Sequence, residues 1–240
     1  LHPRVRRQRQ MCIRDRVSAV GSPFHIASSV GAGKPGQGYP LPWSILQYLP
    51  GETLTHTNVA SETELAQTLA AWLQNLQAID AAEGPLAGQH NFYRGSHLSV
   101  YDKQTRETLV HLAAVLPEKD LASYRRLWEE ALDSRYEGRP VWVHGDVAVG
   151  NLLAQNGRLS AMIDFGTMGV VDPACDYVMA WTFFTGKARE TFLAGLDAGL
   201  IARAKGWALW KALITYTDEN PDFEALSRVV LREVLTPYRI

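Results

Sequence analysis

The stretch of sequence that decides the fold is His-Gly-Asp-Val-Ala-Val-Gly-Asn at residues 144–151, followed by Asp-Phe-Gly at residues 164–166. Two short apolar runs lie between these motifs and are separated by Asn156 and Gly157. Because Asn-Gly tolerates positive φ at both central positions of a turn, the segment predicts a tight β-hairpin. Such a hairpin would bring the two motifs to the same end of a sheet.

The polar side chains of the two motifs are the types that phosphoryl transfer to a hydroxyl requires. Asp146 can accept the hydroxyl proton. Asn151 and Asp164 both offer oxygen, which is the ligand atom that Mg²⁺ prefers. An Asp, an Asn five residues later and then Asp-Phe-Gly is the order of the catalytic and metal-binding loops in kinases. Each tripeptide alone is a weak signal, but together, with a hairpin between them, they predict a kinase active site.

These motifs resemble those of the aminoglycoside phosphotransferase family, a branch of the protein-kinase-like fold. Asp-Pro-Ala-Cys-Asp at residues 172–176 belongs to the same pattern, and the resemblance covers nearly everything from about residue 20 onward. It implies an α+β, protein-kinase-like fold that contains the end of the N-terminal lobe (N-lobe) sheet and a mostly helical C-terminal lobe (C-lobe). It also implies an ATP- and Mg²⁺-dependent O-phosphotransferase whose acceptor is an aminoglycoside or a similar hydroxylated small molecule.

The resemblance further implies a role for each residue of the catalytic site. Asp146 would be the catalytic base, and Asn151 and Asp164 would hold Mg²⁺. His144 would support the catalytic loop without reacting. Asp176 would brace the same loop by accepting backbone N–H bonds, since one carboxylate can accept several.

Binding of the two substrates is implied for segments outside the catalytic loop. The backbone of a hinge would bind adenine, and the hinge would consist of Gln47, Tyr48 and Leu49. Acidic side chains near the C-terminus would face the acceptor, namely Asp218, Glu219 and Asp222. Thr-Met after the Asp-Phe-Gly, at residues 167–168, departs from the family pattern and predicts a difference on the acceptor side.

Length and composition are those of a globular chain. The 240 residues are 46% hydrophobic and 20% charged, which excludes a disordered protein. The longest apolar run, residues 177–184, is far shorter than the roughly 20 residues needed to span a bilayer. The two cysteines, Cys12 and Cys175, lie far apart, so a disulfide framework has no basis and the cytoplasm is the expected location.

The net charge of −1 conceals a basic head and an acidic body. Residues 1–16 contain six arginines and one acidic residue, whereas the remaining residues carry a balance of −6. A nucleic-acid arm would predict a basic body as well, so no nucleic-acid partner is expected. We interpret residues 1–16 as an extraneous segment outside the domain. The mildly acidic body is compatible with a cationic acceptor.

The segment before the predicted hinge is short for an N-lobe. We expect residues 17–50 to be a remnant of the N-lobe ending in the hinge strand, and residues 51–240 to form the C-lobe. The remnant holds one lysine, Lys34, in a Gly-rich stretch that lacks the Ser/Thr of a phosphate-binding loop, so this stretch is expected to be a turn between strands. A fragment with weak or no activity is therefore expected. The alternative is a non-catalytic kinase-like remnant or binding module, that is, a pseudokinase.

Periodicity predicts the remaining elements. A helix is expected from Ser61 to Asp80, because Ser61 and Glu64 fit a capping box and apolar residues recur at helical spacing. Further helices are expected at residues 106–116 and 121–132 and throughout the chain after Cys175. Strands are expected within residues 23–30, 43–49 and 141–143. Cys175, Trp207 and Trp210 are interpreted as packed core residues.

Overall fold

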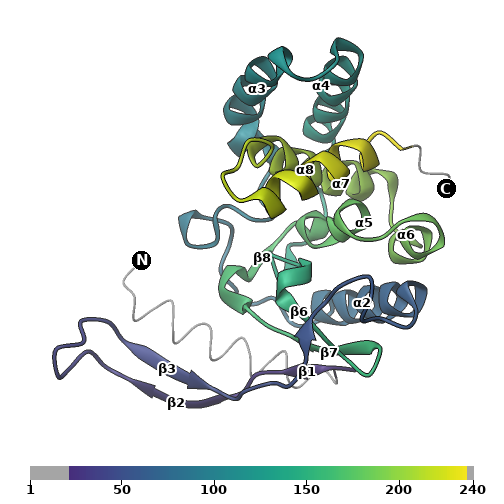
Figure 1. The fold of residues 1–240 in the computed structure, drawn as a ribbon. Helices are drawn as coiled ribbons and strands as arrows, with labels where there is room; N and C mark the ends of the chain where they lie inside the picture. Colours follow the sequence, from purple (N-terminus) through teal and green to yellow (C-terminus); the bar gives the residue numbers. More distant parts are fainter. Residues whose placement is uncertain (1–21, 237–240) are drawn as a thin grey trace.

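The computed structural model describes residues 22–236, which form a largely helical body from which a β-hairpin projects (Figure 1). The strands are β1 (His25–Ile26), β2 (Ser29–Gly33), β3 (Trp43–Leu46), β4 (Glu52–Thr53), β5 (Val141–Val143), β6 (Leu152–Gln155), β7 (Arg158–Met162) and β8 (Gly169–Val171). The helices are α2 (Glu62–Gln77), α3 (Asp102–His111), α4 (Glu118–Asp133), α5 (Met179–Thr182), α6 (Gly186–Leu193), α7 (Ala198–Ile214) and α8 (Pro221–Glu233). This arrangement has the α+β class that the sequence predicts.

A four-stranded sheet with the order β1-β7-β6-β4 carries the predicted hairpin. Strands β6 and β7 are antiparallel, and Asn156 and Gly157 between them have φ values of 53° and 78°. The prediction of an Asn-Gly turn is therefore confirmed. Strand β1 adds to β7 in parallel, and β4 adds to β6 in antiparallel fashion.

Strands β2 and β3 form a separate antiparallel pair that extends away from the body (Figure 1). The Gly-rich stretch around Lys34 connects these two strands, as predicted. Strand β2 nevertheless continues to Gly33, which pairs with Trp43, although a strand is expected only within residues 23–30. Backbone pairing with β3 overrides the low strand preference of glycine at these positions.

The predicted helix after Ser61 is observed as α2. The Ser61 hydroxyl accepts a hydrogen bond from the backbone N–H of Glu64 at 3.2 Å, so the predicted N-cap is confirmed. The expected apolar stripe is buried, and Trp72 packs against Phe165 of the Asp-Phe-Gly motif with ring centroids 6.4 Å apart. The helix ends at Gln77, three residues earlier than predicted.

Helix α7 lies at the centre of the helical body. It packs against α3, α4 and α8 and against the 3₁₀ turn at Pro173–Tyr177. Trp207 and Trp210 are buried core residues, which confirms that prediction. The predicted helices around residues 106–116 and 121–132 are present as α3 and α4, each beginning a few residues earlier. No helix among residues 22–236 is long and apolar enough to cross a membrane.

Candidate active site

The catalytic loop begins where β5 ends, at the fully buried His144. The imidazole Nε2 lies 3.1 Å from the carbonyl oxygen of Ile163, and Nδ1 lies 3.3 Å from the backbone nitrogen of Asp146. A carbonyl can only accept and a backbone N–H can only donate, so the ring carries its proton on Nε2. Burial lowers the pKa of His144, which favours this neutral form. His144 thus ties the loop to the end of β7.

Asp176 also anchors the beginning of the loop. One carboxylate oxygen accepts the N–H of His144 and the other accepts that of Gly145, each at 2.7 Å. Complete burial raises the pKa of Asp176 to about 7, although the two N–H bonds act to lower it. Thr167, one of the two residues that depart from the family pattern, adds a hydroxyl bond of 3.0 Å to the carbonyl oxygen of His144.

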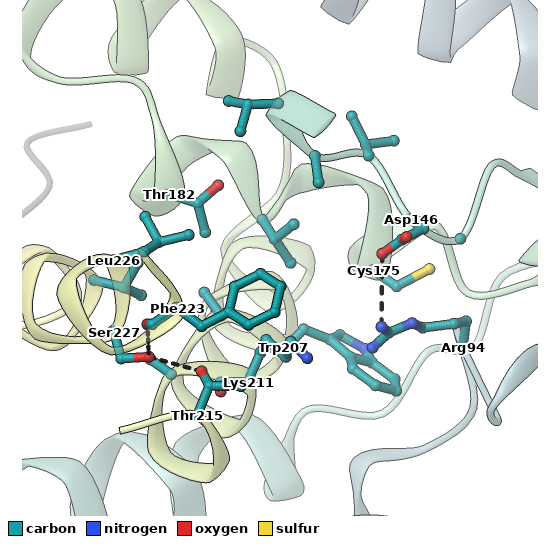
Figure 2. A pocket seen from close by; sticks show the side chains of 18 residues that line it. Arg94, Asp146, Cys175, Thr182, Trp207, Lys211, Thr215, Phe223, Leu226 and Ser227 are labelled. Atoms are coloured by element: carbon teal, nitrogen blue, oxygen red, sulfur yellow. Dashed lines mark hydrogen bonds and ion pairs between the residues drawn. The ribbon is translucent and has the colours of Figure 1, made fainter. Parts of the chain in front are cut away.

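The carboxylate of Asp146 lies between two donors. The amide nitrogen of Asn151 donates to Asp146 Oδ2 at 3.1 Å and to the Asp146 carbonyl at 2.9 Å. Arg94 Nη2 lies 3.6 Å from Asp146 Oδ1 (Figure 2). The side chain of Asp146 remains 41% exposed, so it is oriented by its neighbours and still accessible to a small molecule.

The hairpin brings the two candidate metal ligands to one end of the sheet. The backbone N–H of Ile163 donates to the carbonyl of Asn151 at 2.9 Å, and Asp164 follows directly. Asp164 has a left-handed φ of 57°, and its side chain accepts the N–H of Gly166 at 3.2 Å. One carboxylate and one amide oxygen, both near solvent, fit Mg²⁺, which usually takes one or two carboxylates and completes its shell with phosphates and water.

The predicted hinge follows strand β3. The backbone N–H of Gln47 donates to the carbonyl of Ser28 at 2.9 Å, which extends the β2–β3 pairing by one residue. Tyr48 is 84% exposed, whereas Leu49 is buried. The adenine-binding role of these three residues stays a prediction.

A cavity of about 310 Å³ opens beside Asp146. Its wall combines the catalytic loop with α7 and α8 (Figure 2). The polar or aromatic lining residues are Arg94, Asp146, Cys175, Thr182, Trp207, Lys211, Thr215, Phe223 and Ser227. Sequence reasoning missed Arg94 and Lys211, because neither belongs to a motif. The remaining lining residues are glycine or aliphatic residues.

The three acidic residues predicted to face the acceptor do not line this cavity. Asp218 and Glu219 lie in the turn between α7 and α8, and Asp222 lies in the first turn of α8. Asp218 Oδ1 accepts the backbone N–H of Asn220 at 2.9 Å. Their role in acceptor binding stays a prediction.

Cys175 is packed inside the turn that carries Asp176 and is a free thiol. Burial raises its pKa well above the usual range, so the thiol stays protonated and unreactive. This agrees with the prediction that Cys175 is a packing residue.

An Asp-Asn loop tied to an Asp-Phe-Gly hairpin, with a helical lobe that encloses a cavity next to the Asp, defines a kinase-like phosphotransferase. The profile of the phosphotransferase enzyme family, abbreviated APH, matches residues 2–213. The chain therefore belongs to this family.

Solved structures with the same fold include several aminoglycoside phosphotransferases. The GDP complex of aminoglycoside 2'-phosphotransferase-IIIa has a TM-score of 0.67 at 19% identity, over 93% of this chain and 79% of the other. The GDP and kanamycin complex of APH(2'')-IIIa has a TM-score of 0.65 at 17% identity, over 95% and 83%. ADP-bound APH(2'')-Ib has a TM-score of 0.56 at 20% identity, over 97% and 82%. The kinase-like fold is thus shared.

Proposed function

We propose that the chain transfers the γ-phosphoryl group of ATP, with Mg²⁺, to a hydroxyl of a small molecule. The observation that carries the proposal is the position of Asp146. Its carboxylate is oriented by Asn151 and Arg94 and remains accessible at the edge of a cavity formed by the helical lobe. A base in this position can receive the proton of a bound hydroxyl.

The reaction follows from these groups. The acceptor hydroxyl gives its proton to Asp146 while its oxygen forms a bond to the γ-phosphorus, and the bond between that phosphorus and the β–γ bridging oxygen breaks to release ADP. Asn151 and Asp164 would hold Mg²⁺, which offsets negative charge on the phosphate oxygens. His144 and Asp176 hold the backbone of the loop, so that Asp146 keeps its orientation.

Two observations support ATP as the phosphoryl donor, namely the kinase-like fold and the nucleotides bound in similar structures. Those structures were solved with ADP, GDP and, in one ternary complex, ATP and streptomycin. In this chain we propose that the backbone of residues 47–49 contacts the base. The sequence favours the cytoplasm, where ATP is available to such an enzyme.

The acceptor is proposed to be a hydroxylated small molecule. Similar structures are named as complexes with kanamycin and gentamicin, so an aminoglycoside is one member of the class to be tested. The cavity beside Asp146 lies at the lower end of the size range for small-molecule sites.

The first prediction concerns Asp146→Ala. Phosphoryl transfer from Mg·ATP to a panel of hydroxylated acceptors should fall by a factor of about 10² to 10⁴, because general base catalysis is lost. Affinity for Mg·ATP, measured by calorimetry, should change little, because Asp146 lies on the acceptor side of the loop.

Three outcomes separate the possibilities. Unchanged turnover in Asp146→Ala would remove Asp146 as the base. An unmodified chain that binds Mg·ATP or an acceptor without turnover would favour the binding module, and one that binds neither would favour the non-catalytic remnant. Mg·ATP binding that weakens in Asp164→Asn would support the metal-binding role of Asp164, since Asn tolerates the left-handed backbone but removes the charge.

A further inference from the structure

The charges that line the cavity beside Asp146 do not match a polycationic acceptor. Among the described residues, the lining contains one acidic side chain, Asp146, and two basic ones, Arg94 and Lys211. Phe223, Leu226 and other apolar side chains make up most of the remaining wall. A ligand that carries several ammonium groups would therefore meet two cations and a mostly apolar surface.

Two buried N–H donors on this wall lack an acceptor among the described residues. They are Arg94 Nε and Trp207 Nε1. The Arg94 side chain is only 17% exposed, and the Trp207 ring lies under its guanidinium at 5.9 Å. Both donor atoms are covered by protein, so they do not themselves contact a ligand in the cavity, and the Arg94 guanidinium faces Asp146 at 3.6 Å. Lys211 is therefore the lining cation left for a ligand.

Lys211 is the second cation, and it projects from α7 toward the same cavity (Figure 2). Its ammonium group lies 6.0 Å from the centroid of the Phe223 ring. The charged groups that act on it are Arg94, Asp146 and Asp218. Burial and the nearby Arg94 lower the pKa of Lys211, while the two carboxylates raise it. Lys211 is thus a partly desolvated cation, and an anionic ligand group would stabilise its charge.

We propose that the acceptor is a hydroxylated molecule with an apolar body and a carboxylate, and that Lys211 binds the carboxylate while Arg94 stays paired with Asp146. The inference rests on the proposed function, because it assigns a substrate class to the cavity beside Asp146. The hydroxyl would lie at Asp146, the apolar body would pack on Phe223 and its aliphatic neighbours, and the carboxylate would lie against Lys211.

The test compares two probes that differ at one end, 10-hydroxydecanoate with a carboxylate and 10-aminodecan-1-ol with an ammonium group. Both have the same hydroxyl and chain length, and their dissociation constants are measured by calorimetry on the full chain at one ionic strength. The carboxylate should bind at least about tenfold more tightly, as is typical of a charge-assisted hydrogen bond. Equal binding, or tighter binding of the amine, would overturn the proposal.

A pair of variants identifies the responsible cation. Lys211→Met keeps the aliphatic stem, removes the charge and should abolish most of the preference for the carboxylate. Lys205→Met is the matched control, because Lys205 lies on the same helix but faces Trp181 at 5.9 Å and does not line the cavity. A preference that survives in Lys211→Met, or that disappears equally in both variants, contradicts the role of Lys211.

The outcomes also distinguish this inference from the proposed function. If the carboxylate binds preferentially through Lys211 but no acceptor of the panel is phosphorylated, the carboxylate-binding role of Lys211 stands and the enzymatic proposal fails. If the chain phosphorylates kanamycin but does not prefer the carboxylate probe, the enzymatic proposal stands and the inference fails.

Discussion

At the scale of single residues, Gly145 controls the path of the catalytic loop. Its φ is 84°, and a Cβ at this position would lie 2.5 Å from the carbonyl oxygen of Thr167. Both the backbone conformation and the close approach therefore require glycine. Asp146 directly follows Gly145, so the backbone conformation of Gly145 also determines the position of the Asp146 side chain.

Gly145→Ala should accordingly lower the free energy of unfolding by about 1–3 kcal/mol. Gly150 in the same loop is the matched control, since nothing lies within 4 Å of a Cβ there and no positive φ is required. Gly150→Ala should change stability by no more than about 0.5 kcal/mol. Urea denaturation of both variants measures the difference, and equal effects would show that the loop does not depend on Gly145.

Asp176 makes stability depend on pH in an unusual direction. Burial raises its pKa from an ordinary 3.8 to about 7 in the folded chain. Between these values the folded state retains a proton that the unfolded state has lost. The contribution of this group to stability is therefore complete below about pH 4 and is lost as the pH rises toward 7, by up to about 1.4 kcal/mol for each pH unit.

Asp176→Asn removes this titration, so the free energy of unfolding should depend less on pH between pH 4 and pH 7. The difference in free energy of unfolding, wild type minus variant, should decrease from pH 5 to pH 7. Subtracting the two curves cancels the opposite contribution of His144, whose lowered pKa makes stability decrease as the pH falls below 6.5. A difference independent of pH would show that Asp176 is ionised throughout this range.

At the scale of elements, short sequence patterns predicted the strands and helices whose formation depends on contacts between residues close in the sequence. The β6–β7 hairpin follows from Asn156 and Gly157, whose positive φ values close the turn. Helix α2 follows from the hydroxyl of Ser61 and one apolar stripe. Strand β2 was missed in part because Gly33 is held by pairing with Trp43, a contact that the sequence of β2 alone does not encode.

The candidate site was predictable only where its residues belong to motifs. Asp146, Asn151 and Asp164 lie within about 20 residues of each other, and their order carries the signal. Arg94 and Lys211 reach the same cavity from the loop before α3 and from α7, so tertiary packing alone brings them there. The charge of the cavity consequently differs from what the acidic composition of residues 17–240 predicts.

At the scale of the whole molecule, one buried ion pair joins the parts of the site that are distant in sequence. Arg203 on α7 donates from Nε to Asp172 Oδ2 at 2.7 Å, and both side chains are less than one tenth exposed. The backbone N–H of Asp172 also donates to the carbonyl of Gly95, next to Arg94, at 3.2 Å. The pair thus connects the wall of the cavity, the turn that carries Asp176 and the loop that carries Arg94.

Removing one partner of this pair should therefore affect stability and the site together. Arg203→Met leaves the charge of Asp172 buried and should cost about 3–5 kcal/mol of unfolding free energy. Arg125→Met is the control, because its pair with Glu118 is largely exposed and should contribute less than about 1 kcal/mol. If Arg203→Met does not fold, the double variant Arg203→Met/Asp172→Asn should recover part of the loss, since the uncompensated charge is gone. A cost for Arg203→Met as small as that of the control, or a double variant no more stable than the single one, would show that the pair does not hold these segments together.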